Sequence, residues 1–300
     1  MALPDPVVLA LPFFIAFVCA EIIWGRYHST VSYEMRDALA SLAMGLGNFV
    51  IGFATIIVVV ATFRWAYQFR LLDIGFEWWA FVLIFFAEDF IYYWFHRLSH
   101  EHRIWWAAHI NHHSSQHFNL STALRQTWTG FPSLSWILWV SLAYVGFPPE
   151  MIVFQMGVSL VYQFWFHTEA VDTLWKPIEF FFNTPSHHRV HHAVNPRYLD
   201  RNYGGILIIW DRLFRTFVPG NRTEEPCRYG VVKQIGTFNP FKIAFHEWVA
   251  ILRDLSKPGT LSTKLRYVFG APGWSPDGST KTSAQIRSAY GARFPSTSNR

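Results

Sequence analysis

Residues 38–62 read ALASLAMGLGNFVIGFATIIVVVAT, a run without a single charged side chain. A helix of this length is long enough to cross the hydrocarbon core of a bilayer, which is about 30 Å thick and takes ~17–25 helical residues. Gly45, Gly47 and Gly52 within the run leave room for a neighbouring segment to pack closely. The run therefore predicts a membrane-spanning helix.

Four further apolar segments surround this run. The composition agrees with a membrane protein, because 51% of the residues are hydrophobic and 15% are charged, whereas a soluble domain carries about 25% charged residues. The last two segments are short and are separated by GFPP at 146–149, a strong turn signal, so they predict a helical hairpin. We expect an all-α integral membrane protein with about four to five transmembrane helices. The four segments are residues 7–25, 74–95, 131–148 and 150–167.

Basic residues predict how these helices are oriented. The net charge is +5, and arginines gather in the connector 96–129 and after residue 167, whereas the turn at 146–150 has none. By the positive-inside rule, both polar regions lie in the cytoplasm. Arg64 and Arg70 disagree, because this orientation puts them outside. Since the positive charge accompanies membrane segments, no nucleic-acid partner is expected.

Histidines are concentrated in two short windows. Eleven of the fourteen lie in 96–117 and 187–192. On a helix, residues spaced i, i+4 or i, i+3 and i+4 share one face, and three sets have that spacing. The third set follows NTPS at 183–186, a helix start with proline in the first turn. The sets are His96 and His100 in HRLSH, His109, His112 and His113 in HINHH, and His188, His191 and His192 in HRVHH.

Eight imidazoles on three helical faces predict a site for metal ions. Imidazole binds zinc, copper, iron and nickel, so the ligand type alone leaves the metal open. A catalytic zinc ion takes three protein ligands and keeps one position open, so eight histidines are too many for one such ion. The Glu-x-x-His pattern of soluble di-iron bundles does not occur in this chain. Two metal ions that share the histidines are the simplest interpretation.

Two acidic residues lie close to the first set. On a helical wheel, Asp89 falls in the same arc as His96 and His100. A carboxylate within a membrane and on the ligand face predicts an acceptor that fixes the tautomer of an imidazole. Glu101 directly follows His100, and the roles of ligand, hydrogen-bond partner and proton carrier all remain open for it. The other histidines fit lesser roles: His28 and His246 are isolated, His102 points off the ligand face, and His117 and His187 are candidates to support the ligands.

At these residues the chain resembles the fatty acid hydroxylase/sterol desaturase superfamily, whose members share HxxxH, HxxHH and HxxHH boxes on a membrane-embedded di-iron scaffold. The similarity covers about residues 75–220. The strings YYWFHRLSHEHRIWWAAHINHHSSQHFNLSTALRQ (92–126) and NTPSHHRVHHAVNPRYLDRNYGGILIIWDRLFRTF (183–217) are similar to the alkylglycerol monooxygenase branch. That branch hydroxylates the carbon beside the ether oxygen of ether lipids, with tetrahydrobiopterin as the reductant.

The resemblance implies a fold with a cytoplasmic, histidine-rich helical cap that holds two iron ions. The eight boxed histidines are implied as ligands, with O2 as the co-substrate. His167, in QFWFHTE at the end of the fifth apolar segment, is implied as a ninth ligand. Glu101 matches an acidic residue that follows the first box in that branch, so it joins Asp89 as a candidate catalytic residue. Electrons are expected from a separate donor, either tetrahydrobiopterin or a ferredoxin or cytochrome.

Four regions are expected along the chain. They are N-terminal transmembrane helices over 1–74, the di-iron catalytic domain over 75–220, a cytoplasmic segment over 221–274, and a poorly ordered tail over 275–300, which is rich in Ser, Thr and Gly. The protein is expected in the bacterial inner membrane or the endoplasmic reticulum, with its active site facing the cytoplasm.

The expected reaction is hydroxylation of a lipid C–H bond, and an ether lipid is the substrate that the resemblance implies. Arg125, Arg189 and Asn202 are candidates for binding a polar headgroup. A sterol or acyl-lipid desaturase or hydroxylase of the same superfamily is an alternative, because these enzymes share the box spacing. A membrane metal transporter or sensor is an alternative of another class, although it would place its ligands within the membrane spans.

Overall fold

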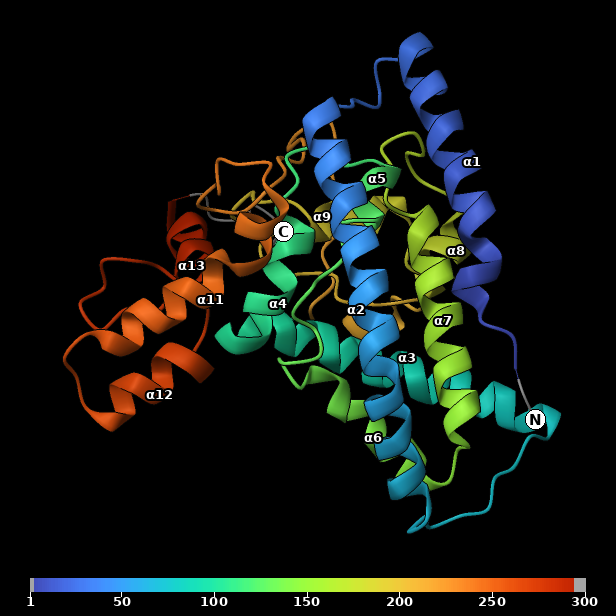
Figure 1. The fold of residues 1–300 in the computed structure, drawn as a ribbon. Helices are drawn as coiled ribbons and strands as arrows, with labels where there is room; N and C mark the ends of the chain where they lie inside the picture. The colour runs from blue at the N-terminus through green and yellow to red at the C-terminus, as the bar shows by residue number, and fades with distance from the viewer. Residues whose placement is uncertain (1–2, 294–300) are drawn as a thin grey trace, which may run out of the picture.

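All the regular structure of residues 3–293, the part of the chain that the computed structural model describes, is helical. Pairing between extended segments in this part is limited to two isolated bridges, Phe182 with Leu207 and Ala193 with Tyr229. The predicted all-α class is therefore confirmed. Figure 1 shows long helices on one side of the molecule and shorter helices joined by long loops on the other.

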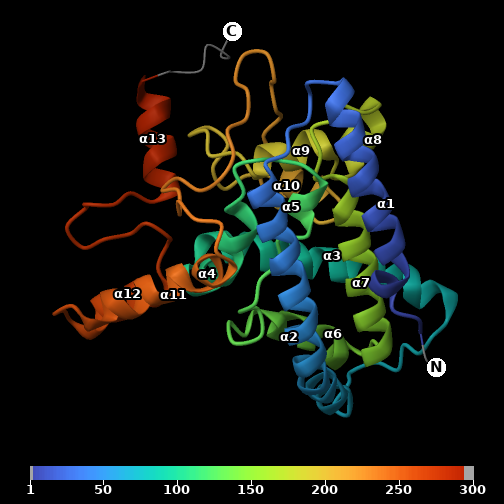
Figure 2. The ribbon, with the colours of Figure 1, turned by 45° about the horizontal axis from the view of Figure 1, so that its top comes forward.

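Three helices are long and apolar enough to cross a membrane: α1 (Pro6–Tyr27), α2 (Met35–Tyr67) and α3 (Trp78–Glu101). The charge-free run 38–62 lies wholly within α2. Helix α7 (Pro149–Trp165) packs between α1 and α2, and α3 crosses this group (Figures 1 and 2). The long apolar helices support the prediction of an integral membrane protein.

The last two predicted spans are shorter helices. Segment 131–148 forms a 3-10 helix, η1 (Ser135–Trp139), followed by α6 (Val140–Val145). The turn at Gly146 is confirmed: its φ is 132°, and a β-carbon there would collide with the carbonyl of Leu72. Because α7 also falls below the length of the three long helices, the predicted number of four to five transmembrane helices is not confirmed.

Close packing around α2 is confirmed at two of the three glycines. A β-carbon on Gly45 would lie 2.6 Å from the carbonyl oxygen of Leu124, and one on Gly47 would overlap the ring of Trp128. The space at Gly52 is open, with nothing within 4 Å. The segment that approaches α2 this closely is the connector that follows α4, so the glycines hold that connector against the membrane helix.

An apolar core at one end of the bundle fixes the position of α3. It joins the end of α2, the start of α3, η1, α6 and the start of α7 through fully buried side chains that include Phe63, Ile84 and Met151. Trp139 of η1 also donates an indole hydrogen bond to buried Glu88 of α3 (3.0 Å). This packing holds α3 so that its last two turns, which carry His96 and His100, meet α4.

Short helices and loops between α3 and residue 220 surround these turns. They are α4 (Arg103–His113), α5 (Leu120–Ala123), α8 (Lys176–Phe181), α9 (Pro185–His191) and α10 (Ile209–Leu213). Helix α9 begins at Pro185, which places the proline in the first turn. The helix start predicted from NTPS is therefore confirmed.

The C-terminal part adds α11 (Pro240–Ser256), α12 (Leu261–Phe269) and α13 (Ser283–Arg293). Composition predicted a poorly ordered tail over 275–300, but residues 283–293 of it form a helix. Arg287 of α13 donates a hydrogen bond to the carbonyl of Leu199 (2.8 Å), which ties this helix to the loop that follows α9. Residues 294–300 of that prediction lie outside the described residues.

Candidate metal centre

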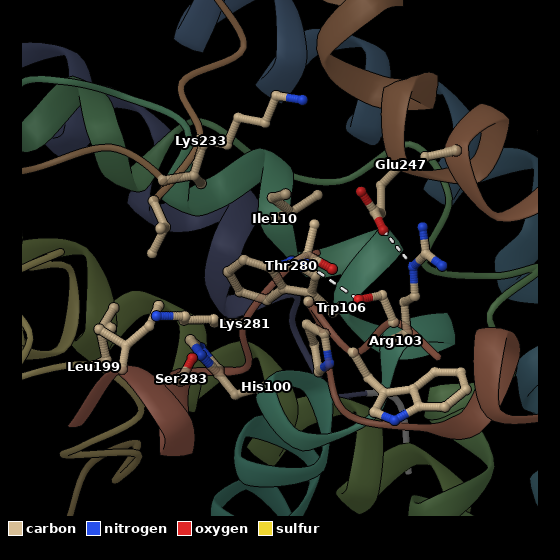
Figure 3. Close-up of a pocket in the computed structure, with 18 of the residues that line it drawn as sticks. His100, Arg103, Trp106, Ile110, Leu199, Lys233, Glu247, Thr280, Lys281 and Ser283 are labelled. Atoms are coloured by element: carbon tan, nitrogen blue, oxygen red, sulfur yellow. Dashed lines mark hydrogen bonds and ion pairs between the residues drawn. The ribbon is translucent and has the colours of Figure 1, made fainter. Parts of the chain in front are cut away.

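A cavity of about 990 Å³ lies between α4 and the C-terminal helices. Figure 3 shows Arg103, Trp106 and Ile110 of α4 on its wall, together with Glu247 of α11. The inner end of the cavity reaches histidines of the predicted boxes, among them His100. A molecule in the cavity would therefore touch the histidine region directly.

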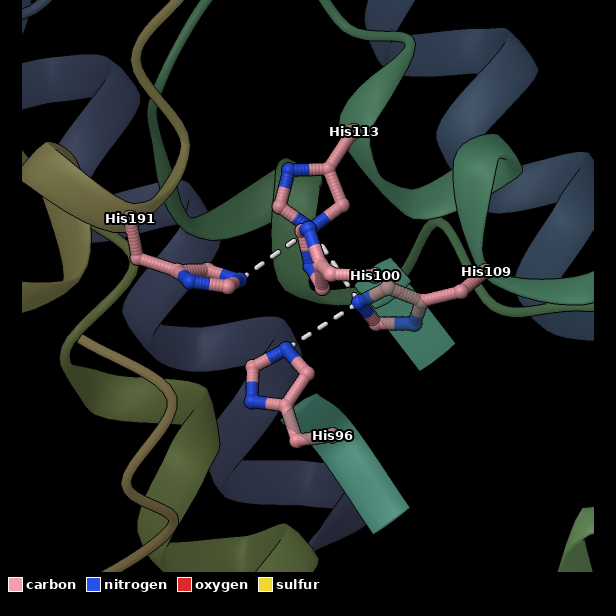
Figure 4. Close-up of side chains that lie close together, drawn as sticks. All are labelled: His96, His100, His109, His113 and His191. Atoms are coloured by element: carbon pink, nitrogen blue, oxygen red, sulfur yellow. Dashed lines mark hydrogen bonds between the residues drawn. The ribbon is translucent and has the colours of Figure 1, made fainter. Parts of the chain in front are cut away.

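Nine histidines meet there in two sets, and within each set one ring nitrogen from every residue lies within 4.8 Å of the others. The first set joins α3, α4 and α9, and its five rings point toward one another (Figure 4). The second set joins α4, the end of α7 and α9. The first set is His96, His100, His109, His113 and His191, and the second is His112, His167, His188 and His192.

Backbone carbonyls fix the direction of four of these rings. A carbonyl oxygen can only accept a hydrogen bond, so the Nδ1 that contacts it carries the proton and Nε2 is left as a bare lone pair. These contacts span 2.8–3.3 Å and pair His96 with Tyr203, His191 with Arg201, His112 with Arg125, and His167 with Gln163.

The second set gives the clearest sign of a bound cation. Nε2 of His112 lies 3.1 Å from Nε2 of His167. Both rings use their Nδ1 proton on a carbonyl, so two lone pairs face each other across this gap. Lone pairs at that distance repel unless a positive ion lies beside both of them. The ring nitrogens of the second set therefore fit the ligands of a metal ion.

Burial keeps the imidazoles neutral, which is the state that binds metal. The pKa of His112 falls to about 4 because the ring is removed from water. Burial also lowers the pKa of His109, His113 and His188 well below the ordinary value. Among the described residues, Nε2 of His100 and Nδ1 of His188 have no hydrogen-bond partner although both are buried. The bare Nε2 of His100 is available as a ligand, whereas His188 faces its set with Nε2, which lies 2.9 Å from Nε2 of His167.

A short loop orients three rings of the first set at once. Asp200 and Asn202 both have left-handed backbone conformations, with φ of 50° and 56°. The resulting turn brings the carboxylate of Asp200 within 3.4 Å of Nδ1 of His100, and it aims the carbonyls of residues 201 and 203 at His191 and His96. Carboxylates and carbonyls behind imidazole ligands set ring orientation and basicity. Sequence reasoning missed Asp200, because no spacing rule connects it to the boxes.

All nine histidines predicted as ligands are brought together, but the two predicted acidic residues are not. Asp89 accepts hydrogen bonds from the backbone of Ile206 (2.6 Å) and Leu207 (3.1 Å) and from the indole of Trp210 (2.9 Å). It therefore holds the 206–210 segment rather than an imidazole. Glu101 turns away from the rings and pairs with Arg97 (2.9 Å) on a partly exposed side of α3.

The three headgroup candidates have structural partners instead. Arg125, which is 1% exposed, forms an ion pair with Asp37 of α2 (2.6 Å). Arg189 binds the carbonyl of Val171 (2.9 Å). The side chain of Asn202 binds backbone carbonyls that include that of Val218 (2.8 Å). Each of the three is buried and stabilises the fold around the rings.

His117 and His187, the two histidines predicted to support the ligands, differ in position, and His102 was predicted to point off the ligand face. His187 lies 3.0 Å from a carboxylate oxygen of Glu179 and is buried beside the second set. His117 bonds to Ser32 near the surface (3.0 Å), and His102 bonds to the carbonyl of Phe269 (2.7 Å). Of these three, His187 is the one whose position suits a supporting role.

Comparison with known proteins agrees with the geometry. Residues 81–216 match the family model described as fatty acid hydroxylase. The chain is 39% identical to an alkylglycerol monooxygenase of Xenopus tropicalis and 38% identical to one of Homo sapiens, in each case over 278 residues and 91% of this chain. It spans 60% and 61% of the length of those relatives.

A more distant relative is an ornithine lipid hydroxylase of Rhizobium tropici, 30% identical over 134 residues, which are 43% of this chain and 39% of that protein. No solved structure gives a significant match. The resemblance predicted from the histidine boxes is confirmed.

Proposed function

We propose that this chain, whose residues 81–216 match the fatty acid hydroxylase family model, is a membrane monooxygenase that hydroxylates a C–H bond of a lipid with O2. The observation that carries the proposal is the pair of histidine sets, five rings and four rings, at the inner end of a cavity. Histidine clusters in a hydroxylase domain indicate iron, and two sets support two iron ions with the nine histidines as ligands.

When bound, the iron ions would supply activation of O2 and removal of hydrogen from an unreactive lipid carbon. The chain's own residues position the reacting groups and exclude water. The carbonyls of Tyr203, Arg201, Arg125 and Gln163 hold rings with Nε2 turned inward. Because most of these rings are less than 6% exposed, bulk water does not compete for the ions.

The cavity supports a substrate with a polar end. Arg103, Lys233 and Glu247 lie on its wall, while Trp106 and Ile110 offer apolar contact. A lipid would place its polar end among the charged groups and the carbon to be oxidised beside His100. The relatives named alkylglycerol monooxygenase favour an ether lipid as this substrate.

The proposal extends to an electron donor and an orientation. Hydroxylation by O2 consumes two electrons from a reductant, so the protein needs a donor such as tetrahydrobiopterin, a ferredoxin or a cytochrome. The arginine distribution supports a cytoplasmic site in the bacterial inner membrane or the endoplasmic reticulum. Arg64, which disagreed with this orientation, forms an ion pair with Glu150 (2.9 Å), so part of its charge is neutralised.

A second candidate is an acyl-lipid hydroxylase or desaturase of the same superfamily, and the similarity to an ornithine lipid hydroxylase favours it. The two candidates share the metal centre and differ in the lipid that enters the cavity. Product analysis separates them, because an ether lipid hydroxylated beside its oxygen falls apart into an aldehyde and an alcohol, whereas an acyl chain keeps its new hydroxyl group.

The test uses the purified full chain in lipid vesicles. Metal analysis is expected to find two iron ions per chain, and incubation with ¹⁸O2, a reductant and an ether lipid is expected to yield ¹⁸O-labelled product by mass spectrometry. His112→Ala should lose metal and activity, whereas His28→Ala, which removes an exposed histidine stacked on Trp24, should keep both. A protein that binds zinc and gives no oxygen-dependent product with any reductant would refute the proposal.

A further inference from the structure

Helix α11 has its polar side turned inward. Glu247 and Asp254 both point to α4, where each accepts a hydrogen bond from Arg103 (2.7 Å in both cases). The opposite side of α11 carries a stripe of large apolar side chains at helical spacing, and they are 44–67% exposed. The stripe consists of Phe241, Phe245, Val249 and Leu252.

Helix α12 extends this surface. Its exposed side carries Leu261, Leu265 and Phe269, which are 48–74% exposed, while Tyr267 is buried on the other side. The two helices pack against each other and lie on the side of α2 that faces away from α1 (Figures 1 and 2). We call these seven exposed apolar residues of α11 and α12 the outer face.

The outer face is not the surface of a helix that faces water. Such a helix turns its polar side outward and its apolar stripe toward the core, whereas α11 exposes an apolar stripe and turns Glu247 and Asp254 toward Arg103. Covering one large apolar side chain contributes about 1.5–3 kcal/mol. Seven such side chains are therefore strongly favoured in an apolar environment over water.

The outer face adjoins the lipid-facing surface of a membrane helix. Ile243 and Ala244 of α11 pack on Ala40 and Met44 of α2. In the same turns of α2, Leu39, Leu42 and Leu46 point away from that contact and are 55–64% exposed, on a helix long enough to span the bilayer. Acyl chains that cover these turns of α2 therefore lie at the same level along the helix as its contact with α11.

Basic side chains border the stripe on α11. Lys242 and Arg253 are exposed and lie next to it on the helical wheel. Long basic side chains at such an edge extend along apolar surface and place their charge among lipid phosphates. The arrangement of Phe and Leu on one side with Lys and Arg at the edge is typical of helices that lie in the membrane interface.

We propose that α11 and α12 lie in the same bilayer as α1–α3, with the outer face among the acyl chains. The partner is the lipid bilayer itself, and the proposal requires neither the metal nor the reaction. It has one structural consequence: the inner side of α11 lines the cavity through His246, Glu247 and Ala250. Helix α11 then forms the wall between the bilayer and the space that leads to the histidines.

Spin labels on the outer face test the proposal. The full chain with Cys19→Ser and Cys227→Ser would carry a nitroxide at Phe245→Cys, Val249→Cys or Leu265→Cys, each in vesicles of phosphatidylcholine and phosphatidylglycerol. In lipid, a nitroxide collides with O2 more than with a water-soluble nickel complex. We expect that result at all three positions and the reverse at Thr223→Cys, a control on an exposed polar loop.

Two results would overturn the proposal. Labels that collide with the nickel complex as often as the Thr223→Cys label does would show that the outer face lies in water. Labels that neither reagent reaches, with spectra broadened by a second nitroxide nearby, would show that another copy of the chain covers the face. Measuring several positions guards against one variant that fails to fold, and none of the positions belongs to the metal centre.

Discussion

The carboxylate of Asp200 lies 3.4 Å from Nδ1 of His100, and its second oxygen lies 3.4 Å from the guanidinium of Arg287. Asp200 thereby connects helix α13, near the end of the chain, to a ring of the first histidine set. The contact leaves Nε2 of His100 free to face the other rings. Asp200 is a positioning residue, since it would act on a bound metal ion through His100.

Replacing this carboxylate is expected to weaken metal binding. Removing a partner behind a ligating histidine typically lowers metal affinity ~10–100-fold, and Asp200→Asn removes the charge while it keeps the shape. The affinity would be measured by iron titration against a chelator of known strength, and the absorption spectrum of the cobalt-loaded protein would report changed ligand geometry.

A matched control for this variant is Asp73→Asn. Asp73 is also an aspartate paired with an arginine, Arg70 (3.0 Å), but it is exposed and lies far from the rings in the chain. It should leave iron affinity and the cobalt spectrum unchanged. If both variants lost affinity equally, the specific role of Asp200 would be refuted.

The bridge from α4 to α11 is expected to stabilise the protein. Arg103 binds Glu247 and Asp254 from a largely buried position, so Arg103→Gln removes the arginine from Glu247 and leaves Asp254 with Lys257 alone. A hydrogen bond to a charged group contributes about 1.5–3 kcal/mol, and we expect the free energy of unfolding to fall by at least that amount. Unfolding in detergent would measure it.

Arg253→Gln provides the comparison, because Arg253 is an exposed residue of the same helix. Its effect on unfolding should stay within about 0.5 kcal/mol. A similar loss of stability in both variants would mean that the bridge contributes little.

The size of the cavity is expected to limit the lipid. Ala250 lines it from α11 without joining the bridge to α4. Ala250→Phe would fill part of the space, and we expect kcat/KM for the lipid to fall by roughly 10-fold or more, the range in which pocket shape discriminates substrates. Iron content should not change, because Ala250 lies outside both histidine sets.

Val249→Phe introduces the same phenyl side chain one residue away, on the outer face. It should leave kcat/KM nearly unchanged. Equal losses from both variants would show that α11 affects activity through its general stability rather than through the volume of the cavity.

Removing the metal is expected to destabilise the fold. Without a cation, the lone pairs of His112 and His167 face each other at 3.1 Å. A ligand that binds the folded state alone contributes about 4 kcal/mol when its free concentration is 1,000 times its Kd. Treatment with a chelator should therefore lower Tm, and adding iron back should restore it. A Tm that is the same with and without metal would argue against an ion in these sets.

The sequence predicted which of the boxed histidines lie together because their arrangement is local. Residues one helical turn apart share a face whatever the rest of the fold does, so His188 and His192 could be paired from spacing alone. The start of α9 at Pro185 could also be predicted from neighbouring residues alone. The membrane helices α1, α2 and α3 followed from the length of apolar runs, which needs no knowledge of tertiary contacts.

The errors and omissions concern contacts between distant parts of the chain. Asp89 shares an arc with His96, but its partners come from residues 206–210, and no property of α3 predicts that segment. Asp200 reaches His100 through a turn in which non-glycine residues have left-handed backbone conformations. Such a conformation is uncommon for these residues and could not be predicted from the sequence. The polar composition of 275–300 predicted a poorly ordered tail and did not indicate helix α13, whose Arg287 donates a hydrogen bond to Leu199.

Helices α4 and α9 each contribute histidines to both sets. His109 and His113 of α4 serve the first set while His112 serves the second, and His191 of α9 serves the first while His188 serves the second. An ion at either set orders the two helices that carry the other, so the second ion should bind more tightly than the first. Loading is then cooperative, and native mass spectrometry at limiting iron should find chains with no ion or two ions in excess of chains with one. In a cell short of iron, such a protein divides into fully loaded and empty molecules, and its activity falls with the number of loaded molecules rather than with the turnover of each.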